Sequence, residues 1–424
     1  MRGLPDLSSL RTLFGGEAPP SPEALPGAAL IAEQVSPQGG RQIRIRSAAE
    51  ARAEAPASTE VRRLLPIRHA TREQSTFRAY FDKGRTLARQ DRWDLLSRMI
   101  RETDRLREIS PAGVRMADVL AAGARSDMVS AARKAIHRGA QPCDAAMADL
   151  DEMAAQGDWP LAATVARMHM DLAWLHHGDL PPVSRPARPS ISFEAHMARA
   201  ARLLDGYSPI EENSPMLAEA RIGLLAGDVT ARERMGDEFE DLIDLDPANP
   251  GPLRAFGLYL TPDWYGTDAA AIDAAASATA DRLADIWGDG AYAWIWLDAL
   301  STDAETAAAC DATRLRRGLF DILDRSPRQE VANLLAGFCA LAMAPGRAPA
   351  GLSEAARSTR TVLHGAADAI IEHHMTEIRP EVWLRGARPA LALPEEPMSP
   401  ADLAADAAQI AAIVKARRSG AVKH

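Results

Sequence analysis

The chain has 424 residues, of which 47% are hydrophobic and 25% are charged, and its formal net charge is −9. This is the composition of a globular protein, and the acidic balance argues against nucleic acid as the main partner, because phosphate binding needs a basic face. Alanine and leucine supply most of the apolar residues, which favours helices over strands.

The cysteines and the hydropathy pattern bear on the cellular compartment. Cys143, Cys310 and Cys339 are odd in number, far apart and without CxxC spacing, which favours a reducing cytoplasm over a disulfide framework. No stretch approaches ~18 uninterrupted apolar residues, and the first residues lack the apolar core of a signal peptide. We therefore expect a cytoplasmic protein without a membrane partner.

Residues 1–70 are predicted to form an extended, partly disordered N-terminal arm. The first sixty or so are rich in Pro, Gly and Ser and lack a sustained helical period. Within them, residues 41–47 (RQIRIRS) alternate Ile with Arg, a pattern of a short strand or an edge-docking peptide. A solvated extended segment is the simpler interpretation of this piece.

Residues 71–385 are predicted to be a run of helices. Trp93, Leu96 and Ile100 show the spacing of one apolar helical stripe. Pro160 fits the first turn of one helix, and Ser214 followed by Pro215 fits an N-cap and the first helical residue of another. The Gly-Ala pair that closes residues 113–124 (GVRMADVLAAGA) indicates a helix end before a second helix at 127–140. Residues 386–398 are predicted to be a proline-containing linker, and 399–424 a C-terminal helix capped by Ser399.

A weak repeat suggests how these helices are arranged. Asp91, Asp158 and Asp228 occupy similar turns before a new helix and lie 67 and 70 residues apart, about twice the period of a tetratricopeptide helix pair. Each helical hairpin can bury its apolar side only against the next hairpin. The predicted fold is all-α, a right-handed α-solenoid of stacked antiparallel hairpins with a concave binding surface.

Residues 142–268 carry a resemblance to a known group. They contain GDWPLAATVARMHMDLAWLHHGD and later LIDLDPANPGPLRAFGLYLTPDWYGTD. A helix with Ala-Trp closed by Gly-Asp, followed by a Pro-x-Trp-x-Gly turn, resembles bacterial tetratricopeptide-like proteins with a domain of unknown function. The resemblance implies an α-solenoid and no catalytic residues. The chain departs from the pattern at Tyr265, where a small residue is expected, and at His176 and His177, where Arg-Gly is expected.

The turn YLTPDWYGTD at 259–268 admits two interpretations. Pro262 predicts that the preceding helix stops near Leu260, Gly266 can take positive φ, and Thr267 or Asp268 can cap the next helix. A helix-to-helix corner with a packed tryptophan is the favoured interpretation. The alternative is a partner-binding notch, which requires an exposed tryptophan. The notch would consist of Asp263, Trp264 and Tyr265.

Aromatic residues recur at 291–300 (AYAWIWLDAL). Tyr292 and Trp296 are four residues apart and share a helical face, whereas Trp294 points elsewhere. Such a helix is buried on both sides or lies in an interface. We favour the core over a groove for a partner helix.

The histidines do not show metal-ligand spacing. His169 and His176 are seven residues apart on one predicted helix, whereas helical zinc sites usually place histidines four apart. We expect no metal, and we expect the histidine pairs at 176–177 and 373–374 to stabilise helix C-termini. The sequence also lacks a phosphate loop, a dinucleotide-binding GxGxxG and a GxSxG elbow, so no cofactor is expected.

These observations favour a non-catalytic scaffold or adaptor that binds a protein or peptide through its concave surface. The candidate contact residues are Trp159, Trp174, Asp263, Trp264 and Tyr265. One alternative is an enzyme with a helical catalytic domain and a dispersed site that uses His169, Asp171 and His176. Another is a self-assembling structural subunit, which would form a homo-oligomer.

Overall fold

The computed structural model describes residues 64–69, 72–110, 113–138, 144–177, 190–387 and 400–419. The chain divides into two compact units, Gly16–Leu64 and a larger unit that holds Leu65–His424 together with Met1–Gly15. Of the smaller unit only Leu64 is described, so the architecture below is that of the larger unit. The predicted segment at 41–47, most of the arm and linker, and Cys143 and Ser399 lie outside the described residues.

Within these ranges the structure is helical and contains no strand, which confirms the all-α class. Two isolated β-bridges occur, between Ile67 and Ile378 and between Ile109 and Arg115. The helices of the first half are α2 (Arg72–Arg89), α3 (Trp93–Arg105), α4 (Met116–His137), α5 (Asp144–Gln156), α6 (Trp159–His177), α7 (Ile191–Leu204), α8 (Pro215–Leu224), α9 (Ala231–Leu245) and α10 (Pro250–Tyr259). Those of the second half are α11 (Ala269–Arg282), α12 (Ala284–Trp287), α13 (Gly290–Thr302), α14 (Ala312–Arg325), α15 (Gln329–Gly337), α16 (Glu354–His373), α17 (Pro380–Gly386) and α18 (Pro400–Arg418).

Short polar side chains begin several of these helices. The hydroxyl of Ser214 accepts a hydrogen bond from the backbone N–H of Leu217, and Pro215 is the first residue of α8, as predicted. The carboxylate of Asp268 caps α11 by accepting from the N–H of Ala271. Pro160 is the second residue of α6. A backbone N–H in the first turn has no acceptor within the helix, so proline costs no hydrogen bond there.

The predicted helix end at the Gly-Ala pair before residue 125 is wrong, because α4 continues from Met116 to His137. Gly123 lies inside α4 at the crossing with α2, where an added Cβ would be 2.0 Å from the backbone oxygen of Phe81. Gly84 of α2 has the same role, since its Cβ would be 2.0 Å from the oxygen of Leu120. The two glycines therefore let the helices approach each other closely, and Gly123 does not end a helix.

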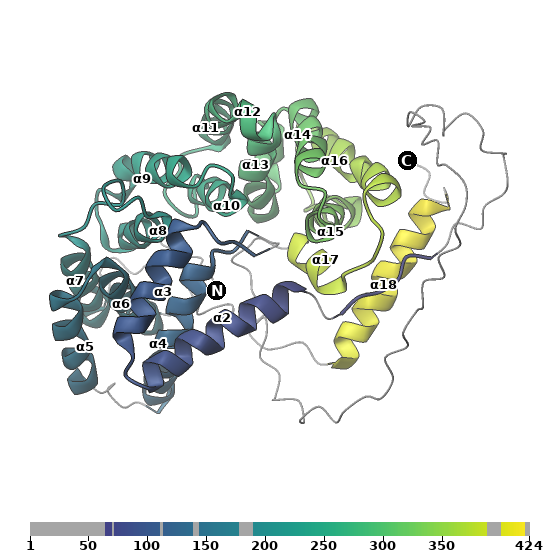
Figure 1. Cartoon of the computed structure of the whole chain (residues 1–424). Coiled ribbons are helices and arrows are strands. Elements are labelled where there is room, and N and C mark those ends of the chain that lie inside the picture. Colours follow the sequence, from purple (N-terminus) through teal and green to yellow (C-terminus); the bar gives the residue numbers. More distant parts are fainter. Residues whose placement is uncertain are drawn as a thin grey trace, which may run out of the picture. The chain divides into compact units, whose positions relative to one another are not determined.

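Helices that are close in the chain also pack against each other. The most extensive contacts join α2 with α4, α6 with α7, α10 with α13 and α15 with α17, and Figure 1 shows the helices following one another in chain order. One cluster of buried apolar side chains runs from α2 to the turn after α8, and a larger one from α8 to α18. The C-terminal helix joins this larger core through Ile410 and Val414.

The segment at 65–69 is extended and docked on the residues before α17. The N–H of Arg68 donates to the carbonyl of Ile378, and the N–H of Ile378 donates to the carbonyl of Pro66, both at 2.8 Å. Leu65 packs against the larger apolar core. This end of the predicted arm therefore folds back on the helical unit.

Candidate functional site

The turn at 259–268 belongs to the core. Trp264 is 2% exposed and Tyr265 is 8% exposed. The Trp264 ring stacks on Tyr259 with centroids 4.7 Å apart, and the backbone N–H of Trp264 donates to the carbonyl of Thr261 at 3.0 Å. Helix α10 ends at Tyr259 with Leu260 as its C-cap, close to where Pro262 predicts the end. A binding notch would require an exposed Trp264, and Trp264 is buried. The turn is therefore a packed corner between two helices.

Gly266 has a different role in this corner from the one expected. Its φ is not positive, because the glycines with positive φ among the described residues are Gly113, Gly288 and Gly351. A Cβ on Gly266 would be 1.6 Å from the carbonyl oxygen of Leu260. Glycine is therefore required for space between two backbone segments rather than for a left-handed conformation.

Of the other predicted contact residues, Trp159 and Trp174 pack against neighbouring side chains. Trp159 is 3% exposed, and the guanidinium of Arg101 lies 5.4 Å from its ring centroid. Trp174 is partly buried and meets Phe193 edge to face at 5.6 Å. Asp263 is partly exposed. Of the five predicted residues, the three buried ones, at 159, 264 and 265, cannot contact a partner unless the core opens.

The aromatic residues of α13 lie in the core. Tyr292, Trp294 and Trp296 are each at most 2% exposed. The Tyr292 hydroxyl contacts the carboxylate of Asp273 in α11 and accepts from the N–H of Asp311 at 2.8 Å. This confirms the favoured interpretation of residues 291–300 and leaves no groove for a partner helix along these rings.

The structure assembles part of the predicted dispersed histidine site. The ring of His169 in α6 lies between Asp151 of α5, at 2.6 Å from Nε2, and His196 of α7, at 2.9 Å from Nδ1. His176 also stacks on His196, with ring centroids 5.8 Å apart. Asp171 is not part of this group, because it pairs with Arg125 of α4. The spacing within α6 could not reveal the partners on α5 and α7.

The contacts of His169 define which nitrogen carries its proton. The carboxylate of Asp151 can only accept, so neutral His169 donates through Nε2 and accepts through Nδ1 from His196. Burial holds the pKa of His169 below its usual value, and Arg199 and Arg202 act in the same direction, whereas Asp151 opposes them. His169 is therefore a neutral, fully buried link between three helices. Among the described residues no group of three or more His, Cys, Asp or Glu side chains is arranged to hold a metal ion.

A buried ionic network joins α4, α6 and α8. Arg115 contacts Asp118 at 2.9 Å and also Glu219, while Arg167 lies 3.4 Å from Asp118 and 3.5 Å from Glu219. Asp246, just after α9, lies 3.9 Å from Arg115. Buried charges persist only when they are paired, so these side chains depend on partners that other helices supply. Its members are up to 131 residues apart in sequence, which is why no local pattern indicated it.

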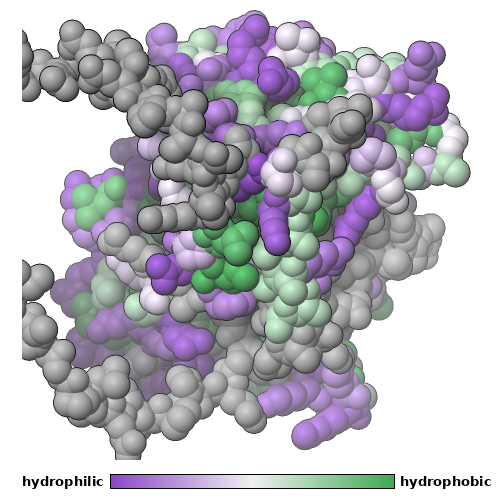
Figure 2. Space-filling view, turned by 90° about the vertical axis from the view of Figure 1, so that its right-hand side faces the viewer, coloured by the Kyte–Doolittle hydropathy of each residue, from purple (hydrophilic) through white to green (hydrophobic). Residues whose placement is uncertain are grey.

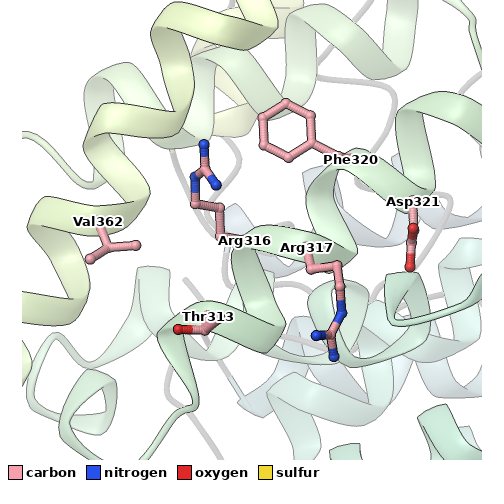
Figure 3. A pocket seen from close by; sticks show the side chains of 6 residues that line it. All are labelled: Thr313, Arg316, Arg317, Phe320, Asp321 and Val362. Carbon is pink, nitrogen blue, oxygen red and sulfur yellow. The ribbon is translucent and has the colours of Figure 1, made fainter.

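A surface groove of about 540 Å³ lies between α14 and α16. Helix α14 contributes the residues at 313, 316, 317, 320 and 321, whose spacing places them on one helical face, and α16 contributes Val362 (Figure 3). The opposite face of α14 is buried through Leu315, Leu319 and Ile322. The lining residues are Thr313, Arg316, Arg317, Phe320, Asp321 and Val362.

Carboxylates neutralise three of the four arginines of α14. These pairs are Arg314 with Asp281 and Asp289, Arg317 with Asp289, and Arg325 with Asp321. Arg316 is the exception, since no carboxylate of the described residues pairs with it. Its guanidinium lies instead 5.3 Å from the ring centroid of Phe320.

Phe320 also packs against His374, with ring centroids 6.1 Å apart. Burial lowers the pKa of His374 from its ordinary value, so this imidazole is neutral near pH 7. The groove therefore presents a fixed aromatic ring, one exposed and uncompensated cation on that ring, and the half-exposed methyl groups of Val362. This arrangement can bind an anionic group beside an apolar one.

Other exposed apolar side chains are spread over several elements. Figure 2 shows one face on which apolar side chains gather near the middle and hydrophilic ones surround them. The large exposed apolar residues of the described part of the chain are Leu64, Ile67, Leu106, Ile191, Ile210, Val229, Ile286 and Val362. Val362 is the member of this set that lines the groove.

Comparison with models of protein families, with curated proteins and with solved structures found no match. The resemblance to tetratricopeptide-like proteins therefore stays a prediction. In the described residues no helix is long and apolar enough to cross a membrane.

Proposed function

We propose that this chain is a non-catalytic scaffold or adaptor, and that the groove between α14 and α16 is a contact site for a protein or peptide partner. The observation that carries the proposal is Arg316, an exposed cation without a carboxylate partner on a helix whose neighbouring arginines are paired. Interfaces are enriched in arginine and aromatic side chains, which supply directed hydrogen bonds and apolar area together.

The proposal includes the finer fold, a right-handed solenoid of stacked hairpins. Its support is that the strongest helix contacts join elements close in the chain, such as α2 with α4 and α6 with α7. Stacked repeats expose elongated surfaces that commonly bind other proteins. A groove built from one face of α14 and one side chain of α16 fits such a surface.

The groove favours binding over catalysis. Its six lining residues include no His, Cys or Lys, and its only hydroxyl is that of Thr313. Nucleophilic or acid–base catalysis needs a reactive group within hydrogen-bond reach of a base. Two arginines, an aspartate and two apolar side chains instead provide recognition by charge and shape.

One observation favours the enzymatic alternative, the Asp151–His169–His196 chain. A carboxylate that orients an imidazole, which then contacts another proton-transferring group, is an arrangement used in acid–base catalysis. His169 itself is fully buried, so substrate would have to reach His196 or Asp151. Activity-based profiling of purified protein with and without the His196→Ala change tests this alternative.

Affinity capture tests the binding proposal. Full-length tagged protein is used in its native cells, together with two variants. The groove variant combines Arg316→Gln and Val362→Asp, and the control variant is Arg98→Gln, at an exposed position of α3. We expect wild type and control to retain one defined partner that the groove variant loses, while all three unfold at similar temperatures. If the groove variant captures as much partner as wild type, the contact lies elsewhere on the protein. If no form captures a partner saturably, the scaffold function is refuted. Light scattering on the same samples identifies self-assembly.

A further inference from the structure

We infer that the groove between α14 and α16 recognises an acidic peptide segment in which a carboxylate side chain neighbours a bulky apolar one. The inference rests on the proposed function and names the chemistry of the partner. It follows from three features of the groove: the charge of Arg316, the apolar walls formed by Phe320 and Val362, and the position of Asp321.

The first feature is the availability of the Arg316 guanidinium. Its planar group can donate two parallel hydrogen bonds to a carboxylate. The contact with Phe320 at 5.3 Å restricts the side chain before binding, so less rotamer entropy is lost when a ligand arrives. Neighbouring Arg317 is less available, because its guanidinium already contacts Asp289.

The second feature is the apolar surface beside this cation. In Figure 3, Arg316 lies between Val362 of α16 and Phe320 of α14. Val362 is 37% exposed, and Phe320 packs against the ring of His374. A bulky aliphatic or aromatic side chain of the ligand can cover these groups and shield the ion pair at Arg316 from water, which strengthens it.

The third feature gives the groove a direction. Asp321 lines the groove on the side of Arg317, away from Val362 (Figure 3). Asp321 is only partly compensated by Arg325 at 3.7 Å, so a second carboxylate placed there is disfavoured relative to a neutral or basic residue. The expected ligand therefore has an acidic residue at Arg316, an apolar residue against Phe320 and Val362, and a neutral or basic residue toward Asp321.

The same charges argue against a nucleic acid. Continuous phosphate binding needs several unpaired cations along a track, and the groove has one, with Asp289 and Asp321 close to its arginines. The chain is also acidic overall. A single carboxylate next to an apolar side chain matches one free guanidinium better than a polyphosphate does.

The test uses short fluorescein-labelled peptides and anisotropy with full-length protein. Two reference probes are used, one with the order Glu-Phe-Lys and one with the order Lys-Phe-Glu, each flanked by Gly and Ser. Matched probes replace Glu by Gln, Phe by Ala, or Lys by Glu, and a single-stranded oligonucleotide is the competing ligand class. We expect each of the three replacements to weaken binding, the Glu-to-Gln replacement by about tenfold, as for loss of a charge-assisted hydrogen bond at a partly exposed site.

Protein variants assign the effect to Arg316. Arg316→Gln should bind the Glu and Gln probes equally, Arg316→Lys should retain part of the preference, and Arg98→Gln should behave as wild type. Equal binding of the Glu and Gln probes to wild type, or tighter binding of the oligonucleotide, overturns the inference. If the probes fail but affinity capture still depends on the groove, the proposed function holds and this ligand class is wrong. If both fail, both are wrong.

Discussion

The guanidinium of Arg125 on α4 donates from Nε to the carboxylate of Asp171 on α6 at 2.6 Å, and both side chains are buried. This contact joins two of the helices that carry the ionic network around Arg115. It also accounts for Asp171, which the sequence offered as part of a dispersed catalytic site. The residue holds two helices together and lies apart from His169.

Removing one member of this pair should be more damaging than removing both. Arg125→Leu or Asp171→Leu leaves a buried, uncompensated charge and should lower the free energy of unfolding by about 3–5 kcal/mol. The double variant, which leaves neither charge, should cost less than the sum of the two. Urea unfolding of the four proteins measures this. The exposed pair Glu102 and Arg105 is the control, where the same removals should change little. Additive costs at Arg125 and Asp171 would show that the pair is not coupled.

The crossing of α2 and α4 should not tolerate a side chain at Gly84. An added methyl group would be 2.0 Å from the carbonyl oxygen of Leu120, so the helices must separate. We expect Gly84→Ala to destabilise the fold by ~1–3 kcal/mol. The matched control is Gly236→Ala in α9, where nothing lies within 4 Å of the added Cβ. There the higher helix propensity of alanine should stabilise the protein by about 0.5–1 kcal/mol. Thermal unfolding distinguishes the two, and equal effects would refute the close crossing.

Asp104 should make the fold less stable as pH rises. Burial raises the pKa of Asp104 to about 6, although the side chain accepts hydrogen bonds from Ser214 and from the N–H of Met216. Because the folded state then binds this proton more tightly than the unfolded state does, stability is lost between about pH 4 and 6. Asp104→Asn keeps an acceptor without the charge, and should gain up to about 3 kcal/mol over wild type at pH 7. At pH 4 the two proteins should be similar. A difference that does not grow with pH would contradict this account.

His169 should have the opposite pH dependence. Its pKa is lowered in the folded state, mainly by burial, so below about pH 6.5 the unfolded chain takes up a proton that folded His169 does not. The stability contributed by neutral His169 is present above that pH and is lost as pH falls. Wild type should therefore lose more stability between pH 7 and 5 than His169→Gln, as measured by urea unfolding at each pH. His373→Gln at the exposed end of α16 is the control and should follow wild type. Parallel curves for all three proteins would exclude a role for His169.

The helical architecture was largely predictable from local sequence. Apolar stripes and capping residues act within one or two turns, so Ser214, Pro215 and Asp268 could be assigned without knowledge of the fold. The end of α10 before Pro262 was predictable for the same reason. The local rules failed at Gly123, which they assigned to a helix end. This glycine instead lies inside α4 because α2 packs closely against it at Phe81.

The sequence by itself therefore determined that the described chain is a series of helices, and where several of them begin and end. Only the tertiary structure decided which side chains are covered: it buried Trp159, Trp264 and Tyr265, joined His169 to Asp151 and His196, and left Arg316 exposed on Phe320. The physical reason is distance along the chain. Helix formation depends on neighbours a few residues away, whereas burial and charge pairing depend on residues that only folding brings together.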